Sequence, residues 1–263
     1  MNAVPDSSTE PMILRADLDG VATLTLNRPG QFNALSQAML EALLAELQAI
    51  AADKSVRVVV LAGAGKAFCA GHDLKEMRGN HTKAFMQALF RLCGKVMMQI
   101  VGMPQPVVAR IHGIATAAGC QLVAMCDLAV ASRDARFAVS GVNLGLFCST
   151  PAVALSRNLA RKAAFEMLVT GDFISADEAK AKGLVNRVAA PEALDAEVEA
   201  LVARIVTKPR TAIALGKGLF YRQLETGLAA AYEDAGRTMA CNMMDPSALE
   251  GVQAFIDKRP PNW

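Results

Sequence analysis

The stretch HGIATAAGCQLVAMCDLAVAS, residues 112–132, decides the fold class of this chain. It follows PVVARI (106–111), an apolar run typical of a buried strand. Very small residues fill positions 113–120, an apolar segment occupies 121–126, and LAVA (128–131) predicts the next strand. A strand, a small-residue turn, an apolar segment and another strand in this order favour an α/β fold.

A second small-residue loop, FCAGHDL (68–74), follows another predicted buried strand at 57–62. Small side chains let a ligand approach the backbone closely. Where such a loop enters a helix, the first N–H groups have no partner and favour negative charge. One N–H group from each loop would suffice for an oxyanion hole. Two ordinary strand-to-helix turns without a ligand would have the same sequence pattern. The residues alone therefore do not decide between an oxyanion hole and two structural turns.

The flanking sequence extends this α/β pattern and then becomes helical. Residues 13–27 alternate and break at Asp19-Gly20, which predicts a hairpin. Ser36 is the expected N-cap of a helix ending near Ala52, and a further helix is expected over 82–100. Beyond Pro151 we expect helices at 151–169, 176–182, 192–206, 209–225, 227–243 and 246–257, with one strand at 184–188. We therefore divide the chain into an α/β core (1–190) and a C-terminal helical region (191–263).

Composition narrows the classes of partner. With 27 basic and 25 acidic side chains the net charge is +2, so no nucleic-acid partner is expected. Three histidines without zinc-type spacing predict no metal site. Six cysteines without a CxxC motif indicate a reducing compartment. Segment 1–11 lacks a basic residue and no uninterrupted apolar run reaches the length of a membrane span, so we expect a cytoplasmic protein without a membrane partner.

Five separated motifs resemble the enoyl-CoA hydratase/isomerase (crotonase) superfamily. They are NRPGQFNALS (27–36), FCAGHDLKEM (68–77), the 112–132 stretch, VTGDFISADEAKAKGLVNRV (169–188) and EGVQAFIDKRPPNW (250–263). The GHDL, AAGCQLV and GVNLGLFCSTP elements are most similar to the enoyl-CoA hydratase domain-containing protein 3 group. The resemblance implies a crotonase fold: repeated ββα turns forming two near-perpendicular sheets, with a C-terminal helical part. It also implies homotrimers or hexamers (dimers of trimers), with region 191–263 serving for capping and trimerisation.

The same resemblance implies an acyl-CoA thioester as substrate, with coenzyme A as part of it and no separate cofactor. The oxyanion donors would be the backbone amides of His72 and Ala118; the second position is usually glycine, but a backbone donor survives that change. Segments 28–34 and 66–72 would line the CoA groove, and Phe255 and Lys258 would contact CoA, often across a subunit boundary. The substrate-binding residues expected are Arg28, Phe32, Ala34, Lys66, Ala70, Asn143, Phe255 and Lys258.

Two catalytic positions depart from the family pattern. Where hydratases carry two glutamates, this chain has Gln121 and Gly141. Glutamine cannot accept a proton from water and glycine has no side chain. Because general acid–base catalysis contributes about 10²–10⁴-fold per group, we predict the loss of standard hydratase activity. The His72 imidazole is the alternative proton carrier, with packing or ligand contact as its other possible roles.

Three functions therefore remain open. One is an enzyme of fatty acid metabolism, of the lyase or isomerase class, that stabilises the enolate or oxyanion of an acyl-CoA. The second is an atypical hydratase or isomerase, and the third is an acyl-CoA-binding protein without catalysis. The GHD and VNLG elements also resemble malonyl-type acyl-CoA decarboxylases, whose reaction forms an enolate without a base.

Overall fold

The computed structural model describes residues 10–263. The strands are β1 (Ile13–Leu18), β2 (Val21–Leu26), β3 (Val58–Gly63), β4 (Val107–Ile111), β5 (Ile114–Thr116), β6 (Leu128–Ser132), β7 (Arg136–Ala138), β8 (Ile174–Ser175) and β9 (Arg187–Ala189). The helices are α1 (Gln37–Ala52), α2 (Leu74–Gly79), α3 (Lys83–Gly102), α4 (Ala118–Met125), α5 (Ser149–Asn158), α6 (Arg161–Thr170), α7 (Ala176–Lys182), α8 (Leu194–Val206), α9 (Arg210–Gln223), α10 (Leu228–Met243) and α11 (Pro246–Ile256). Short 3₁₀ helices cover Pro29–Gln31, Ser140–Leu144 and Pro191–Ala193.

Two sheets organise the body of the molecule. The larger sheet has the order β1-β2-β3-β4-β6-β9, and the smaller one has the order β5-β7-β8. In the larger sheet only β1 pairs antiparallel, with β2, and the remaining neighbours are parallel. The strands β3 and β4 both end in loops that lead toward the smaller sheet, so the two small-residue loops leave the same edge of the large sheet.

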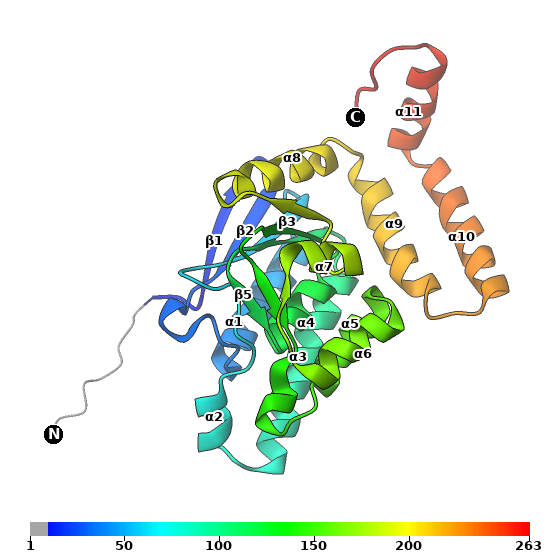
Figure 1. Cartoon of the computed structure of the whole chain (residues 1–263). Coiled ribbons are helices and arrows are strands. Elements are labelled where there is room, and N and C mark those ends of the chain that lie inside the picture. The colour runs from blue at the N-terminus through cyan, green and yellow to red at the C-terminus, as the bar shows by residue number, and fades with distance from the viewer. Residues whose placement is uncertain (1–9) are drawn as a thin grey trace.

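Apolar helices cover both faces of the large sheet. The main core includes Leu40 and Leu43 of α1 and Val96 and Ile100 of α3. A second cluster joins Leu194, Val198 and Val202 of α8 to the opposite face, at Val58, Val60, Val108 and Val130. Helix α8 crosses this face in Figure 1. It therefore packs on the α/β core, and the proposed boundary at residue 190 stays a prediction.

The cap expected at Ser36 is present, and the helix expected over 82–100 begins after a cap at Thr82. Ser36 accepts a hydrogen bond from the Met39 amide at 3.2 Å at the start of α1, and Thr82 accepts one from the Phe85 amide at 3.2 Å at the start of α3. By length and composition α3 would suffice to cross a membrane, a property it shares with the core helices of many globular proteins. It buries one face, including Leu89 and Cys93, in the main core.

The structure differs from the sequence prediction at two places. The helix expected over 151–169 is divided into α5 and α6, because Ala160 is extended (ψ 137°) and the Asn158 side chain donates to the Ala124 carbonyl at 2.8 Å. The strand expected at 184–188 begins only at Arg187, since the Leu184 amide closes the end of α7 on the Ala179 carbonyl at 2.8 Å. Strands β5, β7 and β8 have two or three residues each, too few to show a periodic pattern.

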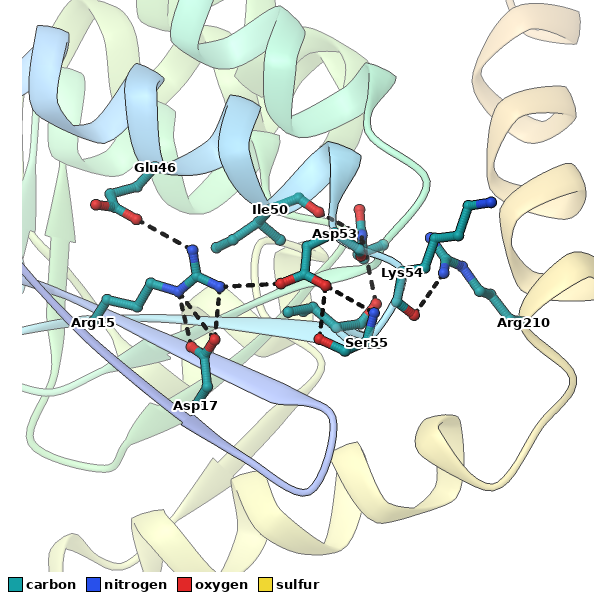
Figure 2. A network of polar contacts seen from close by, with 10 residues as sticks. Arg15, Asp17, Glu46, Ile50, Asp53, Lys54, Ser55 and Arg210 are labelled. Atoms are coloured by element: carbon teal, nitrogen blue, oxygen red, sulfur yellow. Dashed lines mark hydrogen bonds and ion pairs between the residues drawn. The ribbon is translucent and has the colours of Figure 1, made fainter.

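Helices α9, α10 and α11 extend away from the body (Figure 1). One buried group anchors them: Lys217 Nζ donates to the carbonyls of Ile100 (2.7 Å) and Gln105 (2.8 Å) and to Asp127 (2.7 Å). Arg210, at the start of α9, adds a bond to the Lys54 carbonyl at 2.6 Å, beside the ion pairs of Arg15 (Figure 2). The C-terminal helices are thus held by polar contacts more than by a shared apolar core.

Candidate active site

The loops predicted from the sequence run side by side. The Leu35 amide donates to the Gly71 carbonyl at 2.7 Å, and the Asp73 amide donates to the Leu35 carbonyl at 3.3 Å. On its other side the same loop is bonded to β5, through Cys69 N to Ile114 O (3.1 Å) and Thr116 N to Cys69 O (3.0 Å). The 68–74 loop is therefore fixed between the 28–36 segment and the start of the 113–120 turn.

Two glycines permit the close contact between these loops. A Cβ at Gly71, where φ is +91°, would lie 2.9 Å from the Ala117 Cβ and 3.2 Å from the Ala118 nitrogen. A Cβ at Gly119 would lie 2.1 Å from the Cys69 carbonyl oxygen. Any side chain at either position would push the loops apart. The neighbours of these glycines, His72 and Ala118, are consequently brought to the same place.

Ala118 is the first residue of α4, so its N–H group points away from the helix without an intrahelical acceptor. Ala117 precedes it with φ 49° and ψ −117°, an uncommon conformation for a residue with a Cβ, and donates its own N–H to the Ala138 carbonyl at 2.9 Å. Within residues 10–263 neither the His72 nor the Ala118 amide has an acceptor. Two backbone donors are therefore available to a ligand.

A cavity of about 580 Å³ opens at these donors. Of the residues predicted for the site, it is lined by Ala70, His72, Ala118 and Gly141. Its apolar lining comprises Leu74, Met77, Met86, Phe90, Leu144, Leu146 and Phe147. Ser149, Thr150 and Pro151 bring the first turn of α5 to the same wall. No aspartate or glutamate of the described residues lines it, so the cavity has backbone dipoles but no carboxylate.

The His72 ring is held in one orientation. Its Nδ1 lies 3.3 Å from the Leu35 carbonyl, to which it donates, and its ring meets Phe90 edge-on with centroids 5.4 Å apart. Nε2 is buried and has no partner within the described residues. Burial lowers the pKa of His72, against the opposing effect of the Leu35 carbonyl. The ring is thus neutral near pH 7 and carries its lone pair on Nε2.

The two positions predicted to replace the family glutamates have different surroundings. Gln121 lies in α4 with 5% of its surface exposed, and its Oε1 is buried without a partner in the described part of the chain. Gly141 does line the cavity, but a Cβ there would lie 2.6 Å from both the Cys148 Sγ and the Leu146 carbonyl oxygen. Burial raises the pKa of the Cys148 thiol, with the Gly141 amide opposing that shift. No side chain at 141 fits this backbone.

The segments predicted to line the CoA groove are adjacent. The Ala70 amide donates to the Phe32 carbonyl at 3.0 Å, and Asn33 Nδ2 donates to the carbonyls of Ala67 (2.8 Å) and Ala64 (2.9 Å). Asn33 was not among the individual residues predicted for the site. It is fully buried and holds the two segments together. Phe32 and Lys66 are exposed beside this junction, whereas Ala34 is buried.

Arg28 serves this junction as a structural group. Its guanidinium bonds to Asp73 at 3.1 Å and to the Ala34 carbonyl at 3.2 Å. Burial alone would raise the pKa of Asp73, but the Glu76 amide and the Arg28 guanidinium together lower it. Asp73 also caps α2 by accepting from the Lys75 amide at 3.0 Å. The pair therefore fixes the start of α2 directly after His72.

Three of the predicted substrate-binding residues lie apart from both the cavity and the junction of segments 28–34 and 66–72. Asn143 is exposed, with its side-chain amide beside Gly171. Phe255 and Lys258 are exposed at the end of α11, far from α2 in Figure 1. Within one chain they do not reach the cavity, so a contact with CoA would have to come from a second subunit. That contact remains a prediction.

Cys148 and Phe90 also line the cavity but were not predicted from the sequence, because both lie outside the two loops along the chain. Within residues 10–263 no group of three His, Cys, Asp or Glu side chains is arranged to hold a metal ion. All six cysteines lack a disulfide partner, and five of them are buried.

This fold and site define a member of the crotonase class. The family model described as enoyl-CoA hydratase/isomerase matches residues 17–263, and the chain belongs to that family. Enoyl-CoA hydratase domain-containing protein 3, mitochondrial, from Rattus norvegicus is 45% identical, with 93% of this chain and 82% of the relative covered. The crystal structure of the human protein of that name is 42% identical with a TM-score of 0.93, covering 96% of this chain and 100% of the other. A solved enoyl-CoA hydratase from Mycobacterium smegmatis is 68% identical with a TM-score of 0.95, covering 97% and 99%.

These findings confirm the crotonase fold and the resemblance to the domain-containing protein 3 group. They overturn the expected cytoplasmic location, because the rat, mouse and human relatives are named as mitochondrial proteins. That expectation rested on the composition of residues 1–11, of which 1–9 lie outside the described residues. A short terminal composition was too little evidence for a compartment.

Proposed function

We propose that this protein binds an acyl-CoA thioester and holds its carbonyl oxygen with the N–H groups of His72 and Ala118. The observation that carries the proposal is the junction at Gly71, where the two loops meet and leave both donors facing one cavity. Backbone donors fixed in this way stabilise the charge that develops when a thioester becomes an enolate or an oxyanion. A member of the enoyl-CoA hydratase/isomerase family has acyl-CoA as its expected ligand.

The electrostatics of the cavity suit this charge. The ten-residue helix α5 and the helix α4 both begin at the cavity wall, at Ser149 and Ala118. Each helix N-terminus carries a partial positive charge, and no carboxylate among residues 10–263 lines the cavity to oppose it. A developing enolate would therefore be stabilised, and the apolar lining from α2, α3 and the 144–147 segment would receive the acyl chain.

Enzyme-catalysed hydration in the standard family manner is not part of this proposal. Position 121 offers a buried carboxamide and position 141 offers no side chain, so neither supplies a general base for water. We expect crotonyl-CoA hydration, followed by the loss of enoyl absorbance, to be at least about 10²-fold slower than a two-glutamate hydratase would achieve.

The binding experiment compares two ligands and two variants. Calorimetry with butyryl-CoA and with the S-butyl thioether of CoA separates carbonyl recognition from binding of the CoA moiety. Ala118→Pro removes the N–H at the first helical position, where proline suits the helix, while Ala118→Gly keeps it. We expect butyryl-CoA to bind Ala118→Pro about tenfold or more weakly, a change of about 1.4 kcal/mol, with thioether binding unchanged. Equal loss for both ligands, or none, would contradict the proposal.

A malonyl-type decarboxylase is the second candidate function. The carboxylate-free cavity favours it, because loss of CO₂ leaves its electron pair on the enolate and needs no base. Arg78, which lines the cavity without an ion-pair partner among the described residues, is a group that could meet the substrate carboxylate. Release of CO₂ from malonyl-CoA or methylmalonyl-CoA tests this reaction. Tight thioester binding with no turnover of any thioester would indicate a binding protein without catalysis.

The assembly proposed is a homotrimer or a hexamer. The C-terminal helices leave a series of large apolar side chains exposed, among them Phe220, Leu224, Leu228, Tyr232, Met239, Met244, Leu249, Val252, Phe255 and Ile256. Apolar surface on this scale is typical of a subunit interface. Such an interface would also carry Phe255 and Lys258 to a neighbouring subunit's CoA groove.

A further inference from the structure

Among the residues of the cavity wall, His72 alone combines an unprotonated side-chain base with shelter from solvent. The other titratable groups at the cavity are Arg78 and His81, both exposed, and the Cys148 thiol. Arg78 is a permanent cation and Cys148 holds its proton because it is buried. The carboxylate that follows His72, Asp73, is engaged by Arg28 and the α2 amides.

The His72 ring also has the tautomer that a base at Nε2 requires. Nδ1 donates to the Leu35 carbonyl, which fixes the tautomer and leaves the lone pair on Nε2. Nε2 is a buried acceptor without a donor in the described residues. Burying such an atom is unfavourable unless a ligand supplies its partner, and catalytic contacts often form only when substrate is bound.

We propose that Nε2 of His72 takes the proton from Cα of a bound acyl-CoA, so that one residue supplies both an oxyanion donor and the base. This inference rests on the proposed binding of the thioester carbonyl. When the Cα–H bond breaks, its electron pair forms the Cα–C1 double bond and the carbonyl π pair moves onto oxygen. The enolate oxygen is held by the His72 and Ala118 amides, and the imidazolium carries the proton.

The reverse transfer returns a proton to Cα and regenerates the thioester. In D₂O the imidazolium exchanges its proton with solvent, so deuterium enters at Cα without any other reagent. With a 3-enoyl thioester, the enolate extends over the double bond. Return of the proton at Cγ then gives the 2-enoyl isomer. The chemical class of substrate is thus a thioester with at least one α-hydrogen.

The test is deuterium incorporation into butyryl-CoA in D₂O, measured by mass spectrometry. We expect exchange by the native protein and a loss of about 100-fold or more in His72→Ala, which keeps the backbone amide. Butyryl-CoA affinity should change less than threefold, since the amide donors remain. Added imidazole should restore exchange in His72→Ala, a rescue that a merely structural role would not produce.

The pH profile gives a second readout. Exchange should fall as the pH drops through a value below the ordinary pKa of histidine, about 6.5, because protonated Nε2 cannot accept. Arg78, His81 and Cys148 face the same cavity and supply no negative charge to reverse that direction. Unchanged exchange in His72→Ala would overturn the inference. Absence of exchange in a native protein that binds butyryl-CoA would overturn it too, while leaving the proposed function standing.

Discussion

The Sγ of Cys148 occupies the space in which a side chain at position 141 would begin. A Cβ built on Gly141 lies 2.6 Å from this sulfur and 2.6 Å from the Leu146 carbonyl oxygen. The Leu146 amide in turn donates to the Gly141 carbonyl at 2.9 Å, so the backbone closes on the glycine from two sides. At the position where the resemblance predicts a lost glutamate, the path of the chain therefore also leaves no room for a side chain.

Reinstating that glutamate should fail. We expect Gly141→Glu to lower the free energy of unfolding by about 1–3 kcal/mol and to leave crotonyl-CoA hydration unchanged, because the side chain must displace sulfur and backbone. Urea unfolding measures the first effect and enoyl absorbance the second.

Adding Cys148→Ala should recover only part of the stability, since the Leu146 carbonyl remains. Gly236→Ala in α10, where a Cβ meets nothing within 4 Å, is the matched control and should stabilise slightly. A stable, active Gly141→Glu variant would show that the 141–148 segment moves freely.

Gln121→Glu should make stability depend on pH. The side chain is buried and its Oε1 has no partner, so the new carboxyl should have a raised pKa in the folded state. A carboxyl whose pKa is raised by folding destabilises the protein at pH values above the pKa that the carboxyl has in the unfolded chain. The lost stability returns as the pH falls. We expect the deficit relative to Gln121 to be larger at about pH 8 than at about pH 5 in urea unfolding. Gln121→Leu should show no such pH dependence. An equal loss of stability at both pH values would contradict this prediction and would indicate a hydrogen-bond donor beside residue 121.

Lys217→Met should detach the C-terminal helices. Its removal leaves Asp127 and two carbonyls without their cation, and truncating one partner of a buried ion pair costs about 3–5 kcal/mol. Chemical denaturation gives the cost, and limited proteolysis after residue 206 reports release of α9. Lys182→Met, which removes the surface pair with Glu166 at 3.4 Å, should cost about 1 kcal/mol or less. Similar costs for the two variants would refute the anchoring role.

The exposed apolar face of the C-terminal helices should be covered in solution. We expect sedimentation of the full chain to give a trimer or a hexamer. The double variant Leu228→Glu and Tyr232→Glu, at positions 76% and 74% exposed, should shift it toward the monomer because charges would enter a dry interface. Leu18→Glu, at an equally exposed position on β1, should leave the mass unchanged. A native monomer would contradict the proposed assembly and the route of Phe255 to a CoA groove.

Much of the architecture followed from the sequence because local patterns determine it. Ser36 predicted a helix start through its side-chain oxygen, and the apolar runs 57–62 and 106–111 predicted buried strands by their composition. The two small-residue loops predicted only that each could supply a backbone donor. The choice of His72 and Ala118, and the replacement of two glutamates by Gln121 and Gly141, came from the family resemblance and remain predictions.

The tertiary structure alone decided what surrounds those positions. Cys148 meets Gly141, Leu35 fixes the His72 ring, and Lys217 reaches Asp127 across 90 residues, all through contacts between elements distant along the chain. The sequence likewise placed Arg28 among the ligand contacts, while the fold pairs it with Asp73. Local propensity depends on neighbours within a few residues, whereas burial and pairing depend on how whole elements pack. The sequence by itself thus determined the two loops and the residues in them, and the packing of distant elements decided the space, burial and pairing around those residues.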